Sequence, residues 1–238
     1  MFGVKTAVDD CGDAAVRVCV RGGTVEQNWD TVRSIAARLD PSSDGIVSVI
    51  PTYDALLVEF DNLLTDHDAV RALVSDAAAA PEPLWGAPRT FEIPVVYGGE
   101  YGPDLRETAQ FLGVSDTEVI RLHSEAPLVM RCYGSPGGAP MLDGPAFGLP
   151  IPRRSSPRPR VAAGSVAVAG RQAVVSAKPA PGGWAVIGRT PLILVDPTAE
   201  QISAYRPGDL FVFRAIDADR WDEFDGRSLL PIGGDSHG

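Results

Sequence analysis

Residues 81–88 read Pro81-Glu82-Pro83-Leu84-Trp85-Gly86-Ala87-Pro88, with three prolines in eight positions. Each proline fixes its own φ and keeps the residue before it out of the helical region, so this stretch predicts an extended connector. Strand and helix periods alternate before it, and short strands broken by glycine and proline dominate beyond about residue 128. We therefore expect an α/β domain over 1–88, a β-barrel domain over 89–228 and a C-terminal tail over 229–238.

The residues before the connector alternate between strand and helix signals. Runs of β-branched and apolar residues predict strands at 14–20, 46–50 and 54–60, and helical spacing of apolar residues predicts helices at 25–39 and 66–79. Thr24 is placed to cap the first helix, and Pro81 stops the second. The order β-α-β-β-α matches the first five elements of a split βαβ, ferredoxin-like domain, to which residues 91–97 could add the last strand.

Two short helices and then a series of strands are expected after the connector. Residues 102–105 open a helix that runs to about Phe111, and Ser115, with Glu118 at capping-box spacing, begins another that runs through His123. The strands expected further on are 128–133, 165–169, 172–175, 184–188, 192–195 and 209–214. Many short strands separated by glycine and proline are typical of a small β-barrel, so the fold class is α+β.

The composition indicates a soluble globular protein, since 45% of the residues are hydrophobic, 22% are charged and the net charge is −10. An acidic chain is poorly suited to nonspecific nucleic-acid binding, so no nucleic-acid partner is expected. The N-terminus has no basic region followed by an apolar run, and no stretch approaches membrane-spanning length. We expect a cytoplasmic protein without membrane contact. Cys11, Cys19 and Cys132 lack the spacing of a zinc site or a disulfide framework, so no metal site is predicted.

Positive charge is concentrated in one segment. Residues 151–214 contain nine Lys and Arg against three Asp and Glu. Its densest part interleaves arginines with prolines that hold the backbone extended, namely Arg153, Arg154, Arg158 and Arg160 with Pro152, Pro157 and Pro159. This array could bind a carboxylate, a phosphate or an acidic partner surface, because guanidinium groups bind oxyanions through paired N–H donors. A solvated loop face is the alternative.

Residues 181–191 combine three glycines, two prolines and Trp184. Gly182 and Gly183 could let another group approach the main chain closely, with Trp184 as a platform at the edge of a pocket. A strand entry whose tryptophan belongs to the core is an equally good interpretation.

Several motifs together resemble the allophanate hydrolase subunit 1 family, which includes the B subunit of 5-oxoprolinase and KipI and is carboxyltransferase subdomain C-like. They are IPVxYGGexGPDL at 93–105, VIxLH at 119–123, IPRRxxPR at 151–158, and the segments 163–166 and 181–191. The resemblance implies a small α/β domain followed by a cyclophilin-like β-barrel. It also implies a second subunit of related barrel architecture, and ATP-dependent opening of 5-oxoproline to glutamate or urea-derived amide chemistry.

The chain departs from the pattern of this family in two places. Where the family reads GFxPGFxYLGG, Ser135, Ala139 and Met141 stand at the aromatic positions. Where it reads PAGSVGIAGxQTGxY, Ala173 lacks the threonine hydroxyl and Ser176 replaces the tyrosine. These positions lie in the pocket that the resemblance implies, so the changes bear on substrate identity and on catalysis.

Hydrolysis of an amide with ATP needs cations and a base. Catalytic roles are expected for His123, whose ring suits proton transfer near neutral pH, and for the cation of Lys178. The residues expected to bind the substrate or its oxyanions are Arg153, Arg158, Gln172, Gly182, Gly183, Trp184 and Arg189. Alternatives remain for two of them: a helical histidine also serves as a C-terminal cap or a structural residue, and Gln172 could make a hydrogen bond within the barrel.

The sequence contains no P-loop, nucleophile elbow, HExxH or GxGxxG motif. ATP, with or without Mg²⁺, would therefore bind in another manner or largely through partner subunits. The function expected is that of a subunit in an ATP-dependent amidohydrolase complex acting on cyclic or linear amides, resembling 5-oxoprolinase or allophanate hydrolase subunit 1. The alternative is a KipI-like regulatory module that binds and inhibits a sensor histidine kinase. A third hypothesis is a scaffold that retains only the partner interface.

Overall fold

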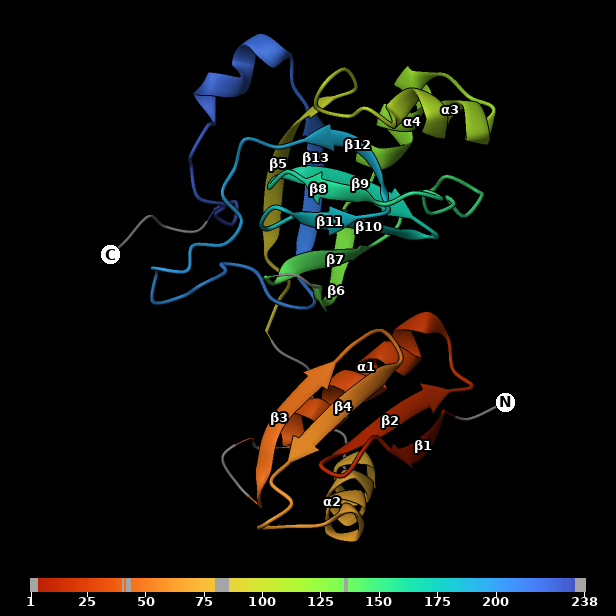
Figure 1. The fold of residues 1–238 in the computed structure, drawn as a ribbon, viewed down its shortest axis with the longest axis vertical. Coiled ribbons are helices and arrows are strands. Elements are labelled where there is room, and N and C mark those ends of the chain that lie inside the picture. The colour runs from red at the N-terminus through yellow and green to blue at the C-terminus, as the bar shows by residue number, and fades with distance from the viewer. Residues whose placement is uncertain (1–3, 40, 42–43, 80–85, 135–136, 234–238) are drawn as a thin grey trace. The chain divides into compact units, whose positions relative to one another are not determined.

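The computed structural model describes residues 4–39, 41, 44–79, 86–134 and 137–233 (Figure 1). The chain divides into two compact units, Met1–Ala87 and Pro88–Gly238, each with its own cluster of buried apolar side chains. Most of the expected connector, Ser135 and the end of the expected tail lie outside the described residues.

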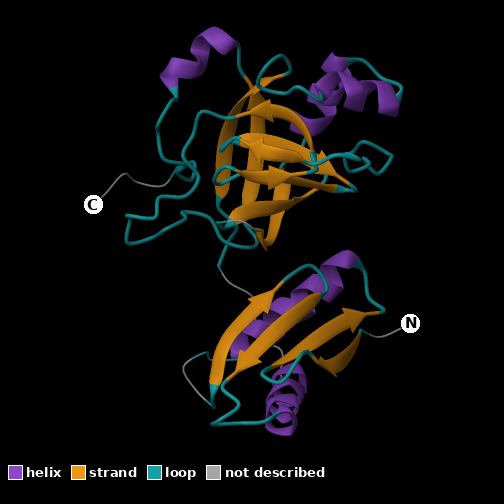
Figure 2. Ribbon diagram, viewed as in Figure 1, coloured by secondary structure: helices purple, strands orange, loops and turns teal. Residues whose placement is uncertain are grey.

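The first unit is a four-stranded antiparallel sheet with two helices packed on one face (Figure 2). Its elements are β1 (Lys5–Asp10), β2 (Ala15–Arg21), α1 (Val25–Arg38), β3 (Ile46–Pro51), β4 (Ala55–Phe60) and α2 (His67–Ala79). The strand order is β1-β2-β4-β3. Alternation along β2 sends Val16, Val18 and Val20 to the helix-covered face, where they are fully buried. Thr24 begins α1 through a capping box with Gln27.

The expectation that residues 91–97 complete this sheet is wrong. The edge beside β2 is taken by β1, and β5 (Thr90–Tyr97) belongs to the barrel of the second unit. Only four residues separate β1 from β2, so their pairing is a local hairpin. Phe91, Ile93 and Val95, by contrast, are fully buried in the barrel core. The polar, exposed sequence of β1 carries no strand signal, which is why it is missed.

The second unit is built around a closed barrel of seven strands in the order β10-β7-β6-β13-β5-β12-β9. The remaining barrel strands are β6 (Leu128–Gly134), β7 (Ala139–Asp143), β9 (Ser165–Ala169), β10 (Gln172–Val175), β12 (Ala185–Arg189) and β13 (Leu210–Ala215). β8 (Arg158–Val161) and β11 (Ala180–Gly182) form a separate two-stranded sheet. The expected β-barrel is thus confirmed, and its architecture is compatible with a cyclophilin-like barrel.

The described residues of the second unit also form helices outside the barrel, namely α3 (Leu105–Leu112), α4 (Asp116–Ser124) and the 3-10 helix η1 (Ala218–Glu223) (Figure 1). The strand expected at 192–195 is wrong, because Ile193 and Val195 make only isolated bridges, to Ser228 and Ser203. This segment pairs with irregular backbone on both sides. The N–H groups of Leu229 and Ile232, at the start of the expected tail, donate to carbonyls of the barrel unit.

The loop that joins β5 to α3 lies directly against β12. The Gly98 N–H donates to the Ile187 carbonyl at 3.1 Å, and the Asp104 N–H donates to the Val186 carbonyl at 2.9 Å. Between these two bonds, a Cβ atom on Gly102 would lie 2.0 Å from the Ile187 oxygen. Only glycine allows so close an approach of two backbone segments.

We predict that Gly102→Ala destabilises the barrel unit by more than about 3 kcal/mol, because the clash is with backbone that must move. Gly183→Ala is the matched control. A Cβ there would have no neighbour nearer than 3.6 Å, so its effect should stay within about 1 kcal/mol. Urea unfolding of both variants checks this, and equal stability of the two would contradict the close packing of the loop on β12.

Candidate binding face of the barrel

A buried aspartate joins three segments of the barrel unit that are distant in sequence. Asp104 is 3% exposed and accepts hydrogen bonds from Arg158 at 2.6 and 2.8 Å and from Arg154 at 2.7 Å. It also accepts the Val186 N–H at 2.8 Å. The donors come from the segment 151–158 and from β12, while Asp104 ends the loop that lies against β12. One carboxylate therefore holds all three segments together.

The surroundings of Asp104 also fix its charge. Burial by itself raises the pKa of this carboxyl, but hydrogen bonds from Arg158 and Val186 and the charges of both arginines outweigh burial and keep the pKa below its ordinary value. Asp104 is therefore ionised near neutral pH. The guanidinium of Arg158, predicted to bind substrate, is directed at this internal carboxylate, as is that of Arg154. The exposed arginines of the array are Arg153 and Arg160.

We call the outward side of β12, β9, β10 and β7 the candidate face, in which Val186, Ala167 and Ala169 are themselves buried beneath other parts of the unit. One outward row consists of Val186, Ala167, Val174 and Met141, and the next row consists of Ala169, Gln172 and Asp143. Their chain neighbours Val168, Ala173 and Leu142 belong to the barrel core. Because successive side chains of a strand point to opposite faces, both rows point away from the core.

Trp184 lies directly before β12, at the end of the second row. Its half-buried side chain packs against a small apolar cluster outside the barrel that contains Val161, Ala167 and Val186. The guanidinium carbon of Arg153 lies 5.8 Å from the centroid of the indole ring, within cation–π range. Arg153 is exposed and has no ion-pair partner among the described residues. A half-buried indole ring and a guanidinium without an ion-pair partner among the described residues thus occur at one place.

The two glycines before Trp184 lie where the arginine-rich segment crosses this surface. The Gly183 carbonyl accepts the Arg154 N–H at 2.8 Å, and Gly182 is the partner of Arg158 in the β11–β8 pair. The structure therefore brings Gly182, Gly183, Arg153, Arg158 and Trp184 to one side of the barrel, beside the row that contains Gln172.

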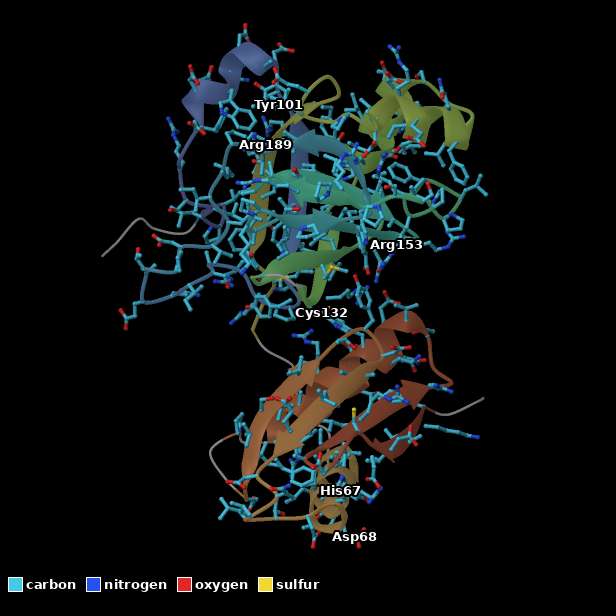
Figure 3. The ribbon with its side chains drawn as sticks, in the orientation of Figure 1. His67, Asp68, Tyr101, Cys132, Arg153 and Arg189 are labelled. Carbon is cyan, nitrogen blue, oxygen red and sulfur yellow. The ribbon has the colours of Figure 1, made fainter. Side chains whose placement is uncertain are left out.

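Arg189 and Lys178 lie elsewhere on the barrel. Arg189 is at the far end of β12 from Trp184, where its Nε donates to the Ala163 carbonyl and its guanidinium lies over Trp221. Figure 3 shows Arg153 and Arg189 well apart, with Tyr101 close to Arg189. Lys178 lies against Gly137, in the turn between β6 and β7. These two cations do not share the surface formed around Trp184.

His123 is fully buried in the barrel unit, beside Phe213, with ring centroids 4.4 Å apart. The Tyr97 hydroxyl lies 2.8 Å from its Nδ1, and its Nε2 has no partner among the described residues. Burial lowers the pKa of His123 to about 3 and raises the pKa of Tyr97. The imidazole is therefore neutral at ordinary pH and has no contact with the candidate face.

This burial predicts a pH effect on stability. Below pH 6.5 the unfolded chain protonates His123 and the folded chain does not, so folding loses about 1.4 kcal/mol per pH unit until the folded pKa is reached. His123→Gln keeps an acceptor for Tyr97 but cannot titrate. Between pH 7 and pH 5 the stability advantage of the wild type over this variant should shrink by about 2 kcal/mol in urea unfolding. A constant difference across that range would contradict a neutral, buried His123.

Sequence reasoning does not single out three charged residues that matter here: Asp104, Arg131 and Asp143. Asp104 lies inside the quoted GPDL motif, in residues 102–105 that are expected to open a helix, and that expectation assigns no role to its carboxylate. Arg131 and Asp143 pair across β6 and β7. No local spacing reveals such a pair, since eleven residues and a turn separate the two.

The residues at which the chain departs from the family pattern are spread over different surroundings. Met141 lies on the first outward row, whereas Ala173 is fully buried in the barrel core. Ala139 is also buried, and the Ser176 N–H donates to the Ser165 carbonyl. Among those departures that the structure describes, Met141 lies on the candidate face and Ala173 lies in the core.

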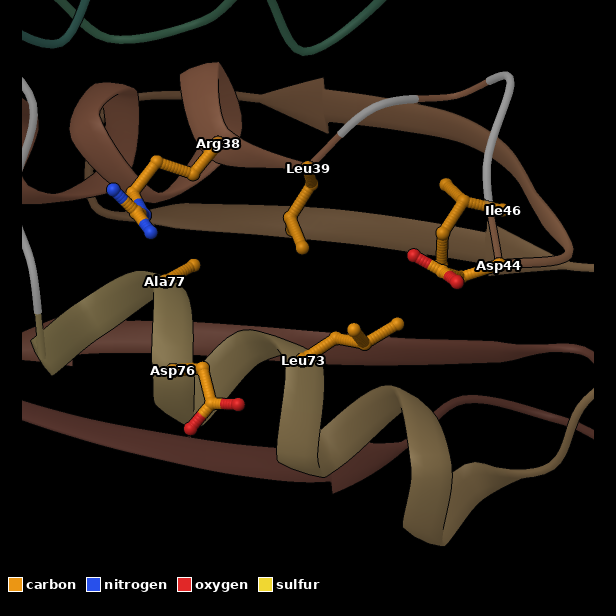
Figure 4. A pocket seen from close by; sticks show the side chains of 7 residues that line it. All are labelled: Arg38, Leu39, Asp44, Ile46, Leu73, Asp76 and Ala77. Carbon is orange, nitrogen blue, oxygen red and sulfur yellow. The ribbon is translucent and has the colours of Figure 1, made fainter.

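A hollow of about 140 Å³ lies in the first unit, between the end of α1, the start of β3 and α2 (Figure 4). It is lined by Arg38, Leu39, Asp44, Ile46, Leu73, Asp76 and Ala77. None of the predicted site residues lies there. Across the described parts of the chain, no three His, Cys, Asp or Glu side chains are grouped so as to hold a metal ion, and no helix is long and apolar enough to cross a membrane.

Comparisons with curated proteins find relatives that share one name. The chain is 34% identical to the B subunit of 5-oxoprolinase from Bacillus subtilis (strain 168) over 225 residues, which are 90% of this chain and 94% of that protein. It is 45% identical to the B subunit of 5-oxoprolinase from Escherichia coli O157:H7 over 121 residues, which are 51% of this chain and 56% of that protein.

Solved structures with similar folds include one chain that this protein covers completely and longer chains that it covers only in part. TTHA0988 matches with a TM-score of 0.73 and 31% identity over 87% of this chain, which spans only 40% of that longer chain. Protein PH0987 from Pyrococcus horikoshii matches with a TM-score of 0.53 and 32% identity, over 90% of this chain and all of that one. The urea amidolyase of Kluyveromyces lactis shares the fold, with a TM-score of 0.76 at 15% identity, over 92% of this chain and 15% of that one.

A sequence model of the family described as "Carboxyltransferase domain, subdomain C and D" matches residues 6–205, which is most of both structural units. Together with the 34% identity that extends over nearly the whole chain, this match shows that the protein belongs to the carboxyltransferase subdomain C and D family.

Proposed function

We propose that this chain is a subunit of a 5-oxoprolinase-like, ATP-dependent amidohydrolase complex that opens a small lactam or amide. The observation that carries the proposal is the 34% identity to a protein named as the B subunit of 5-oxoprolinase, over 90% of this chain and 94% of that one. The name designates one subunit of several, which supports a second subunit as the partner of this chain.

The candidate face offers groups that suit such a substrate. 5-Oxoproline carries a carboxylate and a cyclic amide, and an arginine binds a carboxylate through paired N–H donors. Arg153 presents an available guanidinium over the ring of Trp184. The carboxamide of Gln172 lies along the same row, beyond Ala169, at roughly two strand spacings or about 10 Å between backbones. Arg153 and Trp184 would hold the acidic end of the ligand.

ATP would supply the activation that an amide lacks, by phosphorylating the carbonyl oxygen before water adds to the carbon. Because the chain has no P-loop motif, we assign nucleotide and Mg²⁺ binding largely to the partner subunit. His123 takes no proton-transfer role in this proposal, since it is buried and neutral. Lys178 is exposed and stays a candidate for contact with a phosphate group.

The test is an assay of ATP hydrolysis by the chain co-purified with its partner subunit, with and without 5-oxoproline. We expect hydrolysis to depend on 5-oxoproline and to yield glutamate. Arg153→Ala should raise KM for 5-oxoproline about 10- to 100-fold, because a charge-assisted hydrogen bond to the carboxylate is lost. Arg214→Ala is the matched control, since it removes an exposed arginine that pairs with Glu92 away from the candidate face.

Two results would count against the proposal. One is a stable complex in which 5-oxoproline neither stimulates ATP hydrolysis nor is opened. The other is an equal KM for 5-oxoproline in Arg153→Ala and Arg214→Ala, which would mean that the substrate does not bind at the candidate face. Inhibition of a sensor histidine kinase by the chain, without amide hydrolysis, would favour the regulatory alternative.

A further inference from the structure

A buried arginine holds a partly exposed aspartate on the candidate face. Arg131 Nε and Nη2 donate to Asp143 Oδ1 and Oδ2 at 2.8 and 2.5 Å. The Arg131 side chain is only 4% exposed, whereas that of Asp143 is 32% exposed. The carboxylate is therefore anchored from within the barrel wall and opens toward solvent.

A β-bulge produces this arrangement. Met130 pairs with Leu142 and Cys132 pairs with Met141, so Arg131 is an extra residue in β6. A bulge re-aims the side chain of its extra residue and is frequent beside functional sites. A guanidinium held in the barrel wall also requires a partner of opposite charge. Backbone geometry and charge pairing thus fix the Asp143 carboxylate in one position.

Gln172 lies directly beside this carboxylate. It is the cross-strand partner of Asp143 in the β10–β7 pair, and both residues belong to the second outward row. A carboxylate has about four lone-pair sites and the two bonds from Arg131 occupy two, so acceptor capacity remains. Gln172 adds a donor and an acceptor. The charge of Arg131 balances that of Asp143, which favours a neutral N–H donor over a cation.

We propose that Asp143, positioned by Arg131, is a substrate-recognition residue that accepts the N–H of a small lactam or amide, while Gln172 donates to its carbonyl oxygen. A lactam holds its N–H and its C=O on the same edge of the ring. Two neighbouring strands, about 5 Å apart, can therefore bind both groups at once. The choice of a lactam rests on the proposed function, whereas the pairing of the two side chains rests on the geometry of the face.

The test compares 5-oxoproline with N-methyl-5-oxoproline, which lacks the N–H. Isothermal titration without ATP, on the full chain in complex with its partner subunit, measures both dissociation constants. The wild type should prefer 5-oxoproline by about tenfold or more, because the methylated ligand leaves a charged acceptor unpaired. Asp143→Asn should reduce the preference to about threefold, since a neutral acceptor bonds roughly half as strongly.

Two further variants separate recognition from structure. Glu92→Gln changes an exposed carboxylate that pairs with Arg214 and should leave the preference unchanged. Gln172→Leu leaves the Arg131–Asp143 pair intact and should weaken both ligands about tenfold without changing their ratio. This second variant keeps the proposal testable if Asp143→Asn does not fold.

A preference that stays at the wild-type value in Asp143→Asn overturns the proposal, because a merely structural role would leave the ratio alone. A wild-type complex that binds neither ligand, or binds both equally, overturns it as well. So does unchanged binding in Gln172→Leu. The outcome for the proposed function is read separately: a complex that shows this preference but never opens 5-oxoproline contradicts that function and leaves the binding site standing.

Discussion

Asp104 receives hydrogen bonds from two arginines and one backbone N–H while it is almost wholly removed from water. A buried carboxylate is tolerated only when opposite charge and hydrogen bonds compensate for lost hydration. The loop before α3, the arginine-rich segment and β12 must therefore converge at this point. The close approach of Gly102 to β12 belongs to the same constraint, because it brings the loop near enough to β12 for Asp104 to accept the Val186 N–H.

This convergence divides the arginine array into two parts with different roles. Arg154 and Arg158 face inward and serve the structure, whereas Arg153 and Arg160 are exposed, and Arg153 lies over Trp184. Along the same side of the barrel, the register of β9, β10 and β7 sets Gln172 and Asp143 next to each other. The candidate face is thus a product of strand register and one ion-paired node, since no single motif contains all of its residues.

Local signals in the sequence predict much of the fold but not its long-range pairings. The capping box at Thr24, the alternation in β2 and the apolar strands of the barrel are local, and they appear where they are expected. β1 is missed because an exposed edge strand needs no apolar pattern. The placement of β5 in the barrel depends on parallel pairing with β13, which is more than a hundred residues away.

The site is harder to predict for the same reason. Residue chemistry identifies Arg153, Gln172 and Trp184, which the fold brings to one side of the barrel. It cannot tell that Arg158 has an internal partner, that Arg189 lies at the other end of β12, or that His123 is enclosed in the core, because each depends on which segments meet.

The measurement that bears most directly on the role of Asp104 is a double-mutant cycle of Asp104→Asn and Arg158→Gln, in which the free energy of unfolding is measured in urea. We predict a coupling free energy of about 2 kcal/mol or more, against about 0.2–1 kcal/mol for the exposed Glu92–Arg214 pair. A coupling no larger than that of the exposed pair would contradict the role of Asp104 in holding the barrel face together.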